Sequence, residues 1–219
     1  MRAGFLAAAI AGCGNVAQAQ SVQVIGDSIL VWNSWTDASV VDLLEAEFGG
    51  SVENNAASGA FLTNPNPLGR IFGYDIQIQY EPGEWDWVIV DGGGNDLIGE
   101  CGCGLCDAVL EDLSSGDGRQ GAMPELINQI RDDGSQVVLM GYYLTPTSGT
   151  EWVGCADDMT ALNARYQAIA DRDVDVYFFD PGTVIAREDL TLFDADLLHP
   201  SVKGSEILAD AIADIITAN

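Results

Sequence analysis

Short apolar runs alternate with amphipathic stretches along the chain, and this alternation indicates an α/β fold. Runs rich in β-branched and aromatic residues are typical of strands, and they lie at residues 22–25, 52–56, 87–91, 136–140 and 174–179. Apolar positions at helical spacing predict helices at residues 34–48, 71–80, 120–131, 159–170 and 201–217. Strands that are apolar on both faces are typical of a parallel sheet covered by helices. We therefore expect a five-stranded parallel sheet with helices on both sides.

Polar or glycine residues follow four of the five predicted strands, at the point where each strand ends. Ser28 follows the first strand, Gly59 the second, Asn95 the third, and Asp196 and His199 follow the fifth. In open parallel sheets, ligands bind outside the carboxyl ends of the strands. The sequence therefore predicts one site at this edge of the sheet.

The turn Gly26-Asp27-Ser28 places a serine where the first strand gives way to a helix. Free amide N–H groups and the helix dipole favour negative charge there, so the position suits a nucleophile whose attack creates an oxyanion. The alternative is a helix cap without chemistry, because serine and aspartate are common at helix starts.

His199 is the only histidine in the chain, and it offers the base that a serine nucleophile needs. Imidazole accepts a proton near neutral pH, and a serine hydroxyl must lose its proton in order to attack. Asp196, three residues earlier, could accept the other ring N–H and fix the tautomer. Taken alone, His199 is also explained as a surface or capping residue before the last helix.

Four short blocks occur in order along the chain. They are Gly26-Asp27-Ser28, Gly59, Gly93-Gly94-Asn95-Asp96 and Asp196-Leu197-Leu198-His199-Pro200. Their order and spacing resemble those of the SGNH, or GDSL-type, hydrolases over nearly all of residues 21–219. The resemblance implies a flavodoxin-like three-layer α/β/α sandwich and ester hydrolysis that uses neither a metal nor a cofactor.

The same resemblance implies a role for each matching residue. Ser28 is expected to be the nucleophile, His199 the base, and Asp196 the third member of the triad. The backbone N–H groups of Ser28 and Gly59 and the side chain of Asn95 are expected to form the oxyanion hole. The chain departs from the family in its cysteine-rich insertion after the third block, which could reshape the mouth of the site.

The expected function is that of an exported esterase or lipase-like enzyme acting on a small-molecule ester. Short acyl esters, thioesters, lysophospholipids and acetylated sugars all fit the motifs, and the lack of a long apolar lid segment favours short acyl chains.

Trp32 and Trp35 lie on one helical face and would line an acyl pocket or belong to the core. Tyr142, Tyr143 and Thr145 are expected at the rim. The alternative is a non-catalytic carbohydrate- or surface-binding protein that keeps the fold.

The chain is strongly acidic, with 34 acidic and 8 basic residues and a net charge of -26. Such a surface repels phosphate backbones, so the sequence argues against nucleic-acid binding. Anionic membranes and polyanionic substrates are disfavoured for the same reason, most strongly at low salt.

Residues 1–19 resemble an export signal, with Arg2 before a short apolar run and Ala17-Gln18-Ala19 as a cleavage site. In a second interpretation, Ile10-Ala11-Gly12-Cys13 is a lipoprotein box and Cys13 becomes a lipid anchor. Both interpretations place the protein outside the cytoplasm, as a periplasmic or secreted protein or a membrane-anchored lipoprotein. Both leave residues 21–219 as the hydrolase domain.

Four further cysteines, an even number, suggest two disulfides in an exported protein. A bond between Cys101 and Cys103 would be strained at that spacing. The remaining pairings are Cys101–Cys106 with Cys103–Cys155, or Cys103–Cys106 with Cys101–Cys155. The alternative is a thiolate metal site or redox module, since Cys103 and Cys106 have ligand-like spacing.

Overall fold

Five parallel strands form one sheet in the computed structural model, which describes residues 20–49, 52–64 and 66–219. The strands are β1 (Val22–Ile25), β2 (Val52–Asn54), β3 (Trp87–Val90), β4 (Gln136–Met140) and β5 (Val176–Phe179). Their order across the sheet is β2-β1-β3-β4-β5, and neighbouring strands run parallel. The predicted five-stranded parallel sheet is confirmed. The predicted export signal and Cys13 lie outside the described residues.

The strand order is that of flavodoxin-like folds, in which ligands bind where the connections diverge. The chain passes from β1 to β2 on one side and then to β3 on the other. The register places Ile25 of β1 beside Val90 of β3. The turns that follow these two strands therefore emerge side by side at the carboxyl edge of the sheet.

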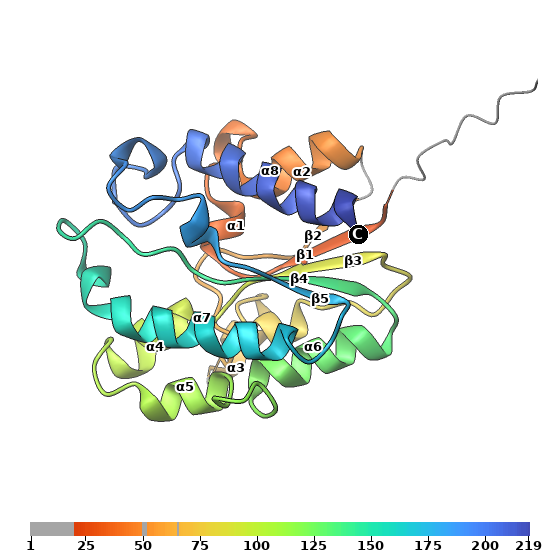
Figure 1. Cartoon of the computed structure of the whole chain (residues 1–219), viewed down its shortest axis with the longest axis horizontal. Helices are drawn as coiled ribbons and strands as arrows, with labels where there is room; N and C mark the ends of the chain where they lie inside the picture. The colour runs from red at the N-terminus through yellow and green to blue at the C-terminus, as the bar shows by residue number, and fades with distance from the viewer. Residues whose placement is uncertain (1–19, 50–51, 65) are drawn as a thin grey trace, which may run out of the picture.

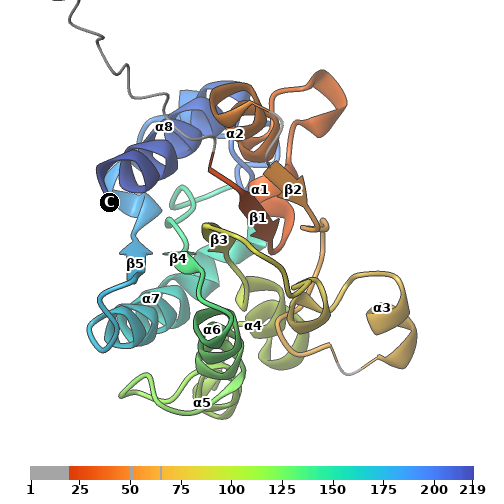
Figure 2. The same cartoon turned by 90° about the vertical axis from the view of Figure 1, so that its right-hand side faces the viewer.

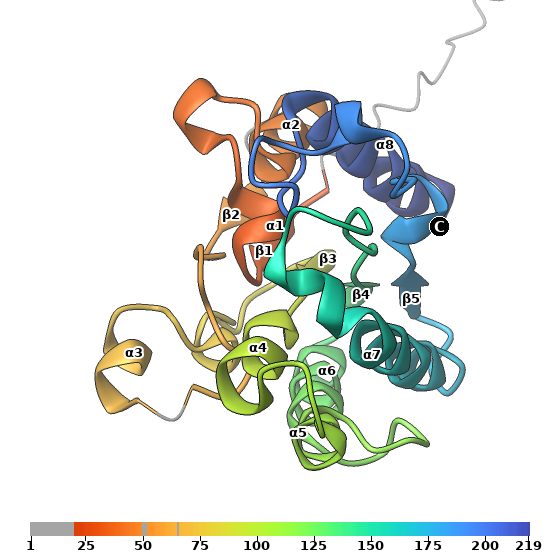
Figure 3. The ribbon, with the colours of Figure 1, turned by 90° about the vertical axis from the view of Figure 1, so that its left-hand side faces the viewer.

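Helices cover both faces of the sheet (Figure 1). One face carries α2 (Val40–Phe48) and α8 (Val202–Ala218), and the other carries α4 to α7, as the two end views also show (Figures 2 and 3). These four helices are α4 (Gly94–Cys101), α5 (Asp107–Leu113), α6 (Ala122–Asp132) and α7 (Ala156–Ala170). Within the described residues, none of the helices combines the length and the hydrophobicity that spanning a bilayer requires.

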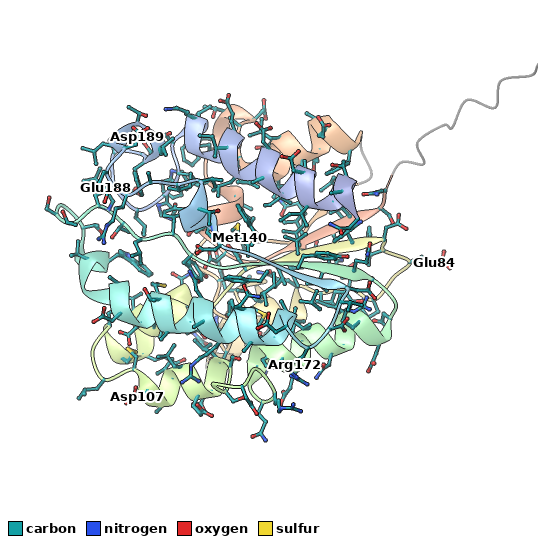
Figure 4. All side chains as sticks on the ribbon, in the orientation of Figure 1. Glu84, Asp107, Met140, Arg172, Glu188 and Asp189 are labelled. Carbon is teal, nitrogen blue, oxygen red and sulfur yellow. A yellow bond between two sulfur atoms is a disulfide. The ribbon has the colours of Figure 1, made fainter. Side chains whose placement is uncertain are left out.

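The core lies between the sheet and these helices. All residues of β1 and β3 are buried, and Met140 at the end of β4 lies inside the molecule (Figure 4). Acidic side chains such as Glu84, Asp107 and Glu188 point outward in the same view. Most acidic side chains thus lie on the surface, with Asp27, Asp75, Asp91 and Asp96 as buried exceptions, while β-branched and aromatic residues fill the interior.

The predicted helix at 34–48 is wrong in its first part. A 3₁₀ helix, η1 (Ser34–Thr36), comes first, and Asp37 then has a φ of +53°. Ser39 starts α2 with a capping box, in which Ser39 Oγ accepts from the Asp42 amide and the Asp42 carboxylate accepts from the Ser39 amide. This reciprocal cap is a strong start signal and fixes the helix boundary at Val40.

The predicted helix at 71–80 is also wrong. A short helix, α3 (Pro67–Ile71), occurs earlier in the chain, and a 3₁₀ turn, η2 (Ile76–Ile78), follows it. The Asn66 side chain caps α3 by accepting from the Leu68 amide. Gly73 has a φ of +78°, which no continuous helix allows.

Two helices in the cysteine-rich part of the chain, α4 and α5, are absent from the sequence prediction. Disulfides join Cys101 to Cys106 and Cys103 to Cys155, which is the first of the two predicted pairings. The four sulfur atoms are thereby bonded in pairs and are not free thiolate ligands, so the structure contradicts the alternative metal site.

The remaining short helices are α1 (Ser28–Val31), η3 (Glu151–Cys155), η4 (Pro181–Thr183) and η5 (Leu190–Leu192).

Candidate active site

Ser28 is the first residue of α1, directly beyond the carboxyl end of β1. The Asp27 side chain accepts a hydrogen bond from the Ile29 amide at 3.0 Å and caps this helix. Gly26 has a φ of +145°, and a Cβ added there would lie 1.8 Å from Asp91 Oδ1, so the turn requires glycine. Asp27 is thus the cap, and the Ser28 hydroxyl is left for another partner.

His199 connects Ser28 to Asp196 through two short hydrogen bonds. His199 Nε2 lies 2.9 Å from Ser28 Oγ, and His199 Nδ1 lies 2.6 Å from Asp196 Oδ2. A carboxylate at Nδ1 favours the tautomer with its proton on that nitrogen, so Nε2 accepts from the serine hydroxyl. The structure therefore brings together three residues that the sequence predicts as partners.

The turn between Asp196 and His199 is held by the same carboxylate. Asp196 Oδ1 accepts from the amides of Leu198 and His199, each at 3.0 Å, and Leu197 between them has a φ of +56°. Partial burial acts to raise the pKa of Asp196, but the hydrogen bonds from the His199 side chain and the two amides outweigh it. The pKa of Asp196 therefore lies below its ordinary value, and the carboxylate stays ionised at neutral pH.

The indole ring of Trp32 packs against the face of the His199 imidazole. The two rings are stacked, with centroids 3.6 Å apart and an angle of 5° between their planes. Trp32 Nε1 donates to Asp194 Oδ2 at 2.7 Å, and the Asp194 amide donates to the His199 carbonyl at 2.8 Å. The indole is thus tied to the loop that carries His199. Trp32 neither lines the pocket nor belongs to the buried core, so both predictions for it are wrong. Trp35 has 64% of its surface exposed and also lies outside the pocket and the core.

Replacing Trp32 with alanine is expected to lower kcat by about 10²-fold, because a displaced catalytic group loses its alignment. Trp32→Phe keeps an aromatic face but loses the bond to Asp194, so a smaller loss is expected. The measurement is the steady-state hydrolysis of a soluble ester. Trp85 lies two residues before β3, at the amino ends of the strands and away from the pocket. Trp85→Ala therefore also removes a tryptophan side chain but should leave kcat unchanged. An equal loss in both alanine variants would contradict a specific role for Trp32.

Gly59 and Asn95 line the same pocket as Ser28 and His199. Gly59 has a φ of +81°, a conformation that glycine adopts without steric cost. Asn95 Nδ2 donates to the Ala60 carbonyl at 2.9 Å, which anchors the amide to the loop that carries Gly59. The predicted oxyanion-hole residues therefore come from three separate strand ends and meet at one pocket.

The Asp96 carboxylate binds the loop that carries Gly59. It accepts from the amides of Leu62 and Thr63 and from the Thr63 hydroxyl, each at 2.8 Å. Burial raises the pKa of Asp96, although these hydrogen bonds act in the opposite direction. Asp96 is fully buried and does not line the pocket, so its contacts position the loop.

A pair of buried carboxyl groups lies under the Ser28 turn. Asp91 Oδ1 accepts from the Asp27 amide at 2.7 Å, and Asp27 Oδ2 accepts from the Tyr142 hydroxyl at 2.6 Å. Burial raises the pKa of Asp27 and raises that of Asp91 much further, with the charge of Asp27 adding to the effect. Among the described residues, Asp91 Oδ2 has no hydrogen-bond partner. Asp91 is therefore expected to be the neutral member of the pair.

Asp91→Asn is expected to raise the melting temperature, and the gain should grow as the pH rises. A raised pKa in the folded state means that Asp91 favours folding at low pH and that this advantage is lost as the pH rises through the folded-state pKa. Asparagine does not titrate, keeps the oxygen that accepts from the Asp27 amide, and avoids this loss. A gain of ~1 kcal/mol at pH 8 corresponds to a shift of about 2–4 °C.

Thermal unfolding measured from pH 4 to pH 9 tests this prediction. Asp210→Asn, at an exposed position in α8, makes the same chemical replacement and should show little difference at any pH. A gain from Asp91→Asn that is constant with pH, or a loss at high pH, would show that Asp91 is ionised in the folded protein.

The pocket beside Ser28 has a volume of about 190 Å³. The structure confirms that the predicted rim residues Tyr142, Tyr143 and Thr145 line it. Several lining residues are missing from the sequence prediction, namely Ser58, Leu144, Trp152, Ala156, Met159 and Leu198. Ser58, Leu144 and Leu198 are sequence neighbours of predicted site residues. Trp152, Ala156 and Met159 come from the connection before α7 and from its first turn, and no local pattern marks them as neighbours of Ser28.

The chain is similar in sequence to a family of known proteins. The sequence profile described as the GDSL-like lipase/acylhydrolase family matches residues 24–207. No curated protein sequence matches the chain.

Similar solved structures include a protein described as an SGNH hydrolase from Slackia heliotrinireducens. It has a TM-score of 0.59 and 18% identity, over 90% of this chain and 98% of that one. A carbohydrate acetylesterase from Sinorhizobium meliloti has a TM-score of 0.63 and 18% identity, over 91% and 99% of the two chains. An acetylxylan esterase from Geobacillus stearothermophilus, solved as a catalytic mutant, has a TM-score of 0.59 and 21% identity, over 89% and 93%. These likenesses establish the SGNH hydrolase fold.

Proposed function

Because the chain belongs to the GDSL-like lipase/acylhydrolase family, we propose that it hydrolyses carboxylic esters through an acyl-enzyme on Ser28. The observation that carries the proposal is the continuous hydrogen-bond chain from Asp196 through His199 to Ser28. This chain ends beside a pocket lined mostly by apolar side chains. A nucleophile, a base and a group that orients the base are the parts that acyl transfer by serine needs.

In the first half-reaction, His199 Nε2 takes the proton of Ser28 as the serine oxygen attacks the ester carbonyl. The imidazolium that forms is stabilised by Asp196, whose low pKa keeps it ionised. His199 then gives the proton to the leaving alcohol, and Ser28 is left as an ester of the acyl group. Water repeats the cycle: His199 accepts its proton, the acid leaves, and the Ser28 hydroxyl is restored.

The oxyanion of each tetrahedral intermediate is proposed to bind the backbone N–H groups of Ser28 and Gly59 and the side chain of Asn95. All three residues line the pocket. Such donors stabilise charge that develops only during the reaction, and removing one typically lowers turnover by ~10²–10³-fold. The positive end of the α1 dipole points at the same place.

Short acyl esters are the proposed substrates, and acetylated sugars are included. The small pocket supports this choice, and two similar structures belong to a carbohydrate acetylesterase and an acetylxylan esterase. We also propose that the protein acts outside the cytoplasm. The two disulfides support an oxidising compartment, because such bonds are rare in the reducing cytosol.

A fluorophosphonate probe tests the proposal directly, because it reacts covalently with an activated serine. Wild-type protein is expected to be labelled at one site per molecule, and Ser28→Ala should not be labelled. Ser34→Ala, at an exposed serine in η1, is the matched control and should be labelled like the wild type. A wild-type protein that is folded by circular dichroism but stays unlabelled would contradict the proposal and favour a non-catalytic binding protein.

A further inference from the structure

One wall of the pocket comes from the long connection between β4 and α7. Leu144 and Trp152 lie in this connection, and Ala156 and Met159 lie in the first turn of α7. Ser28, His199 and the residues proposed for the oxyanion hole line the same pocket. An acyl group attached to Ser28 would occupy this pocket beside these four apolar residues, which we call the acyl wall.

A disulfide fixes the acyl wall to the helix that begins at the oxyanion hole. Cys155 is fully buried and lies between Trp152 and Ala156 in the sequence. It is bonded to Cys103, which follows α4, and α4 begins at Gly94 and Asn95 in the pocket. Cys103 has a φ of +55° and lies in the turn after α4. The Cys103–Cys155 bond thus links the acyl wall to the helix that carries Asn95.

Among the described residues, hydrogen bonds tie the first part of this connection to the body of the protein: Tyr142 bonds to Asp27 and Asn163, and the Tyr143 hydroxyl donates to the Leu198 carbonyl. Arg187 donates two hydrogen bonds to the Thr145 carbonyl near its start. Near its end, Thr150 Oγ1 accepts from the Trp152 amide, but this bond is local and does not join the connection to the body of the protein. Residues 147–149 between these points are exposed. The Cys103–Cys155 bond is therefore a covalent tie for the second part of the connection, close in sequence to Trp152, which also packs against the hydrophobic core.

We propose that Trp152 and Met159 limit the length of the acyl group, and that the Cys103–Cys155 disulfide holds this limit in place. The inference rests on the proposed esterase function and adds the residues that select the substrate. An apolar cavity of roughly 150 Å³ holds one benzene molecule, so a pocket of about 190 Å³ has room for an acyl group of about that size. Acetyl and butyryl groups fit this space, and an octanoyl chain does not.

The test compares kcat/KM for the p-nitrophenyl esters of acetate, butyrate and octanoate. Wild-type protein is expected to prefer acetate and butyrate. Met159→Ala and Trp152→Ala should each raise the ratio of octanoate to acetate hydrolysis by about tenfold or more, the effect of a changed apolar pocket on substrate choice. Met159→Leu preserves the bulk of the wall and should keep the wild-type ratio. An unchanged ratio in both alanine variants would overturn the inference.

The disulfide is tested by removing one bond at a time. The double variant Cys103→Ser/Cys155→Ser should shift the ratio toward octanoate, while Cys101→Ser/Cys106→Ser, which removes a bond that does not reach the acyl wall, should not. Reduction of wild-type protein with dithiothreitol breaks both bonds without substitutions that could prevent folding, and it should also shift the ratio toward octanoate. Equal shifts in both double variants, or no shift in either and none on reduction, would overturn the role of Cys103–Cys155.

Two controls separate this inference from the proposed function. Fluorophosphonate labelling of Ser28 in each variant reports whether the catalytic residues remain assembled. If wild-type protein neither hydrolyses the acetate ester nor reacts with the probe, the proposed function fails and the acyl wall has no substrate to select. If wild-type protein is active and the ratios do not change, the function stands and the acyl wall is wrong.

Discussion

His199→Ala is expected to lower kcat/KM for ester hydrolysis by about 10⁶-fold. His199 Nε2 lies 2.9 Å from Ser28 Oγ, and among the described residues that line the pocket His199 is the basic side chain. Without the imidazole, the serine hydroxyl has no acceptor for its proton and the leaving alcohol has no donor. Initial rates with p-nitrophenyl acetate measure the loss, and circular dichroism confirms that the variant is folded.

A double variant sharpens this prediction. Nucleophile and base act as a unit, so Ser28→Ala/His199→Ala should be no slower than either single variant. The residual rate above that in water would come from the oxyanion hole and substrate binding. If the losses in the two single variants multiplied in the double variant, Ser28 and His199 would act independently, and the proposed proton transfer between them would be wrong.

The positions of the triad residues follow from the sequence because they depend on strand ends. Apolar runs mark β1 and β3 well, and a residue just beyond the carboxyl end of a parallel strand has little freedom in where it lies. Ser28 and Asn95 are fixed in this way. Asp196 and His199 are three residues apart in a loop, and their contact is local, through the turn that the Asp196 carboxylate holds.

The pocket wall is not predictable in the same way. Trp152 and Met159 reach the pocket through the long connection between β4 and α7, and a disulfide between cysteines 52 residues apart ties this connection to the turn after α4. The stacking of Trp32 on His199 joins segments more than 160 residues apart and leaves no periodic pattern. Helix boundaries failed for a different reason: capping by Ser39 and the left-handed angle at Gly73 overrode the apolar spacing.

Asn95→Ala is expected to lower kcat by ~10²–10³-fold with little change in KM. The amide donor stabilises charge that is present in the tetrahedral intermediate but absent from the bound ester, so its loss raises the barrier without weakening substrate binding. Asn95→Asp, which replaces the donor with an acceptor of the same shape, should be at least as slow. Steady-state kinetics with p-nitrophenyl acetate separates the effects on kcat and KM.

The same substitution also removes the hydrogen bond from Asn95 Nδ2 to the Ala60 carbonyl, worth ~1 kcal/mol of stability. Asn55→Ala is a matched control, because Asn55 Nδ2 donates to the Gln79 carbonyl at the same 2.9 Å and lies outside the pocket. Both alanine variants should lose a similar amount of thermal stability, yet only Asn95→Ala should lose turnover. A comparable fall of kcat in Asn55→Ala would mean that Asn95 acts by holding its loop, and Asn95 would then be a positioning residue without a part in the oxyanion hole.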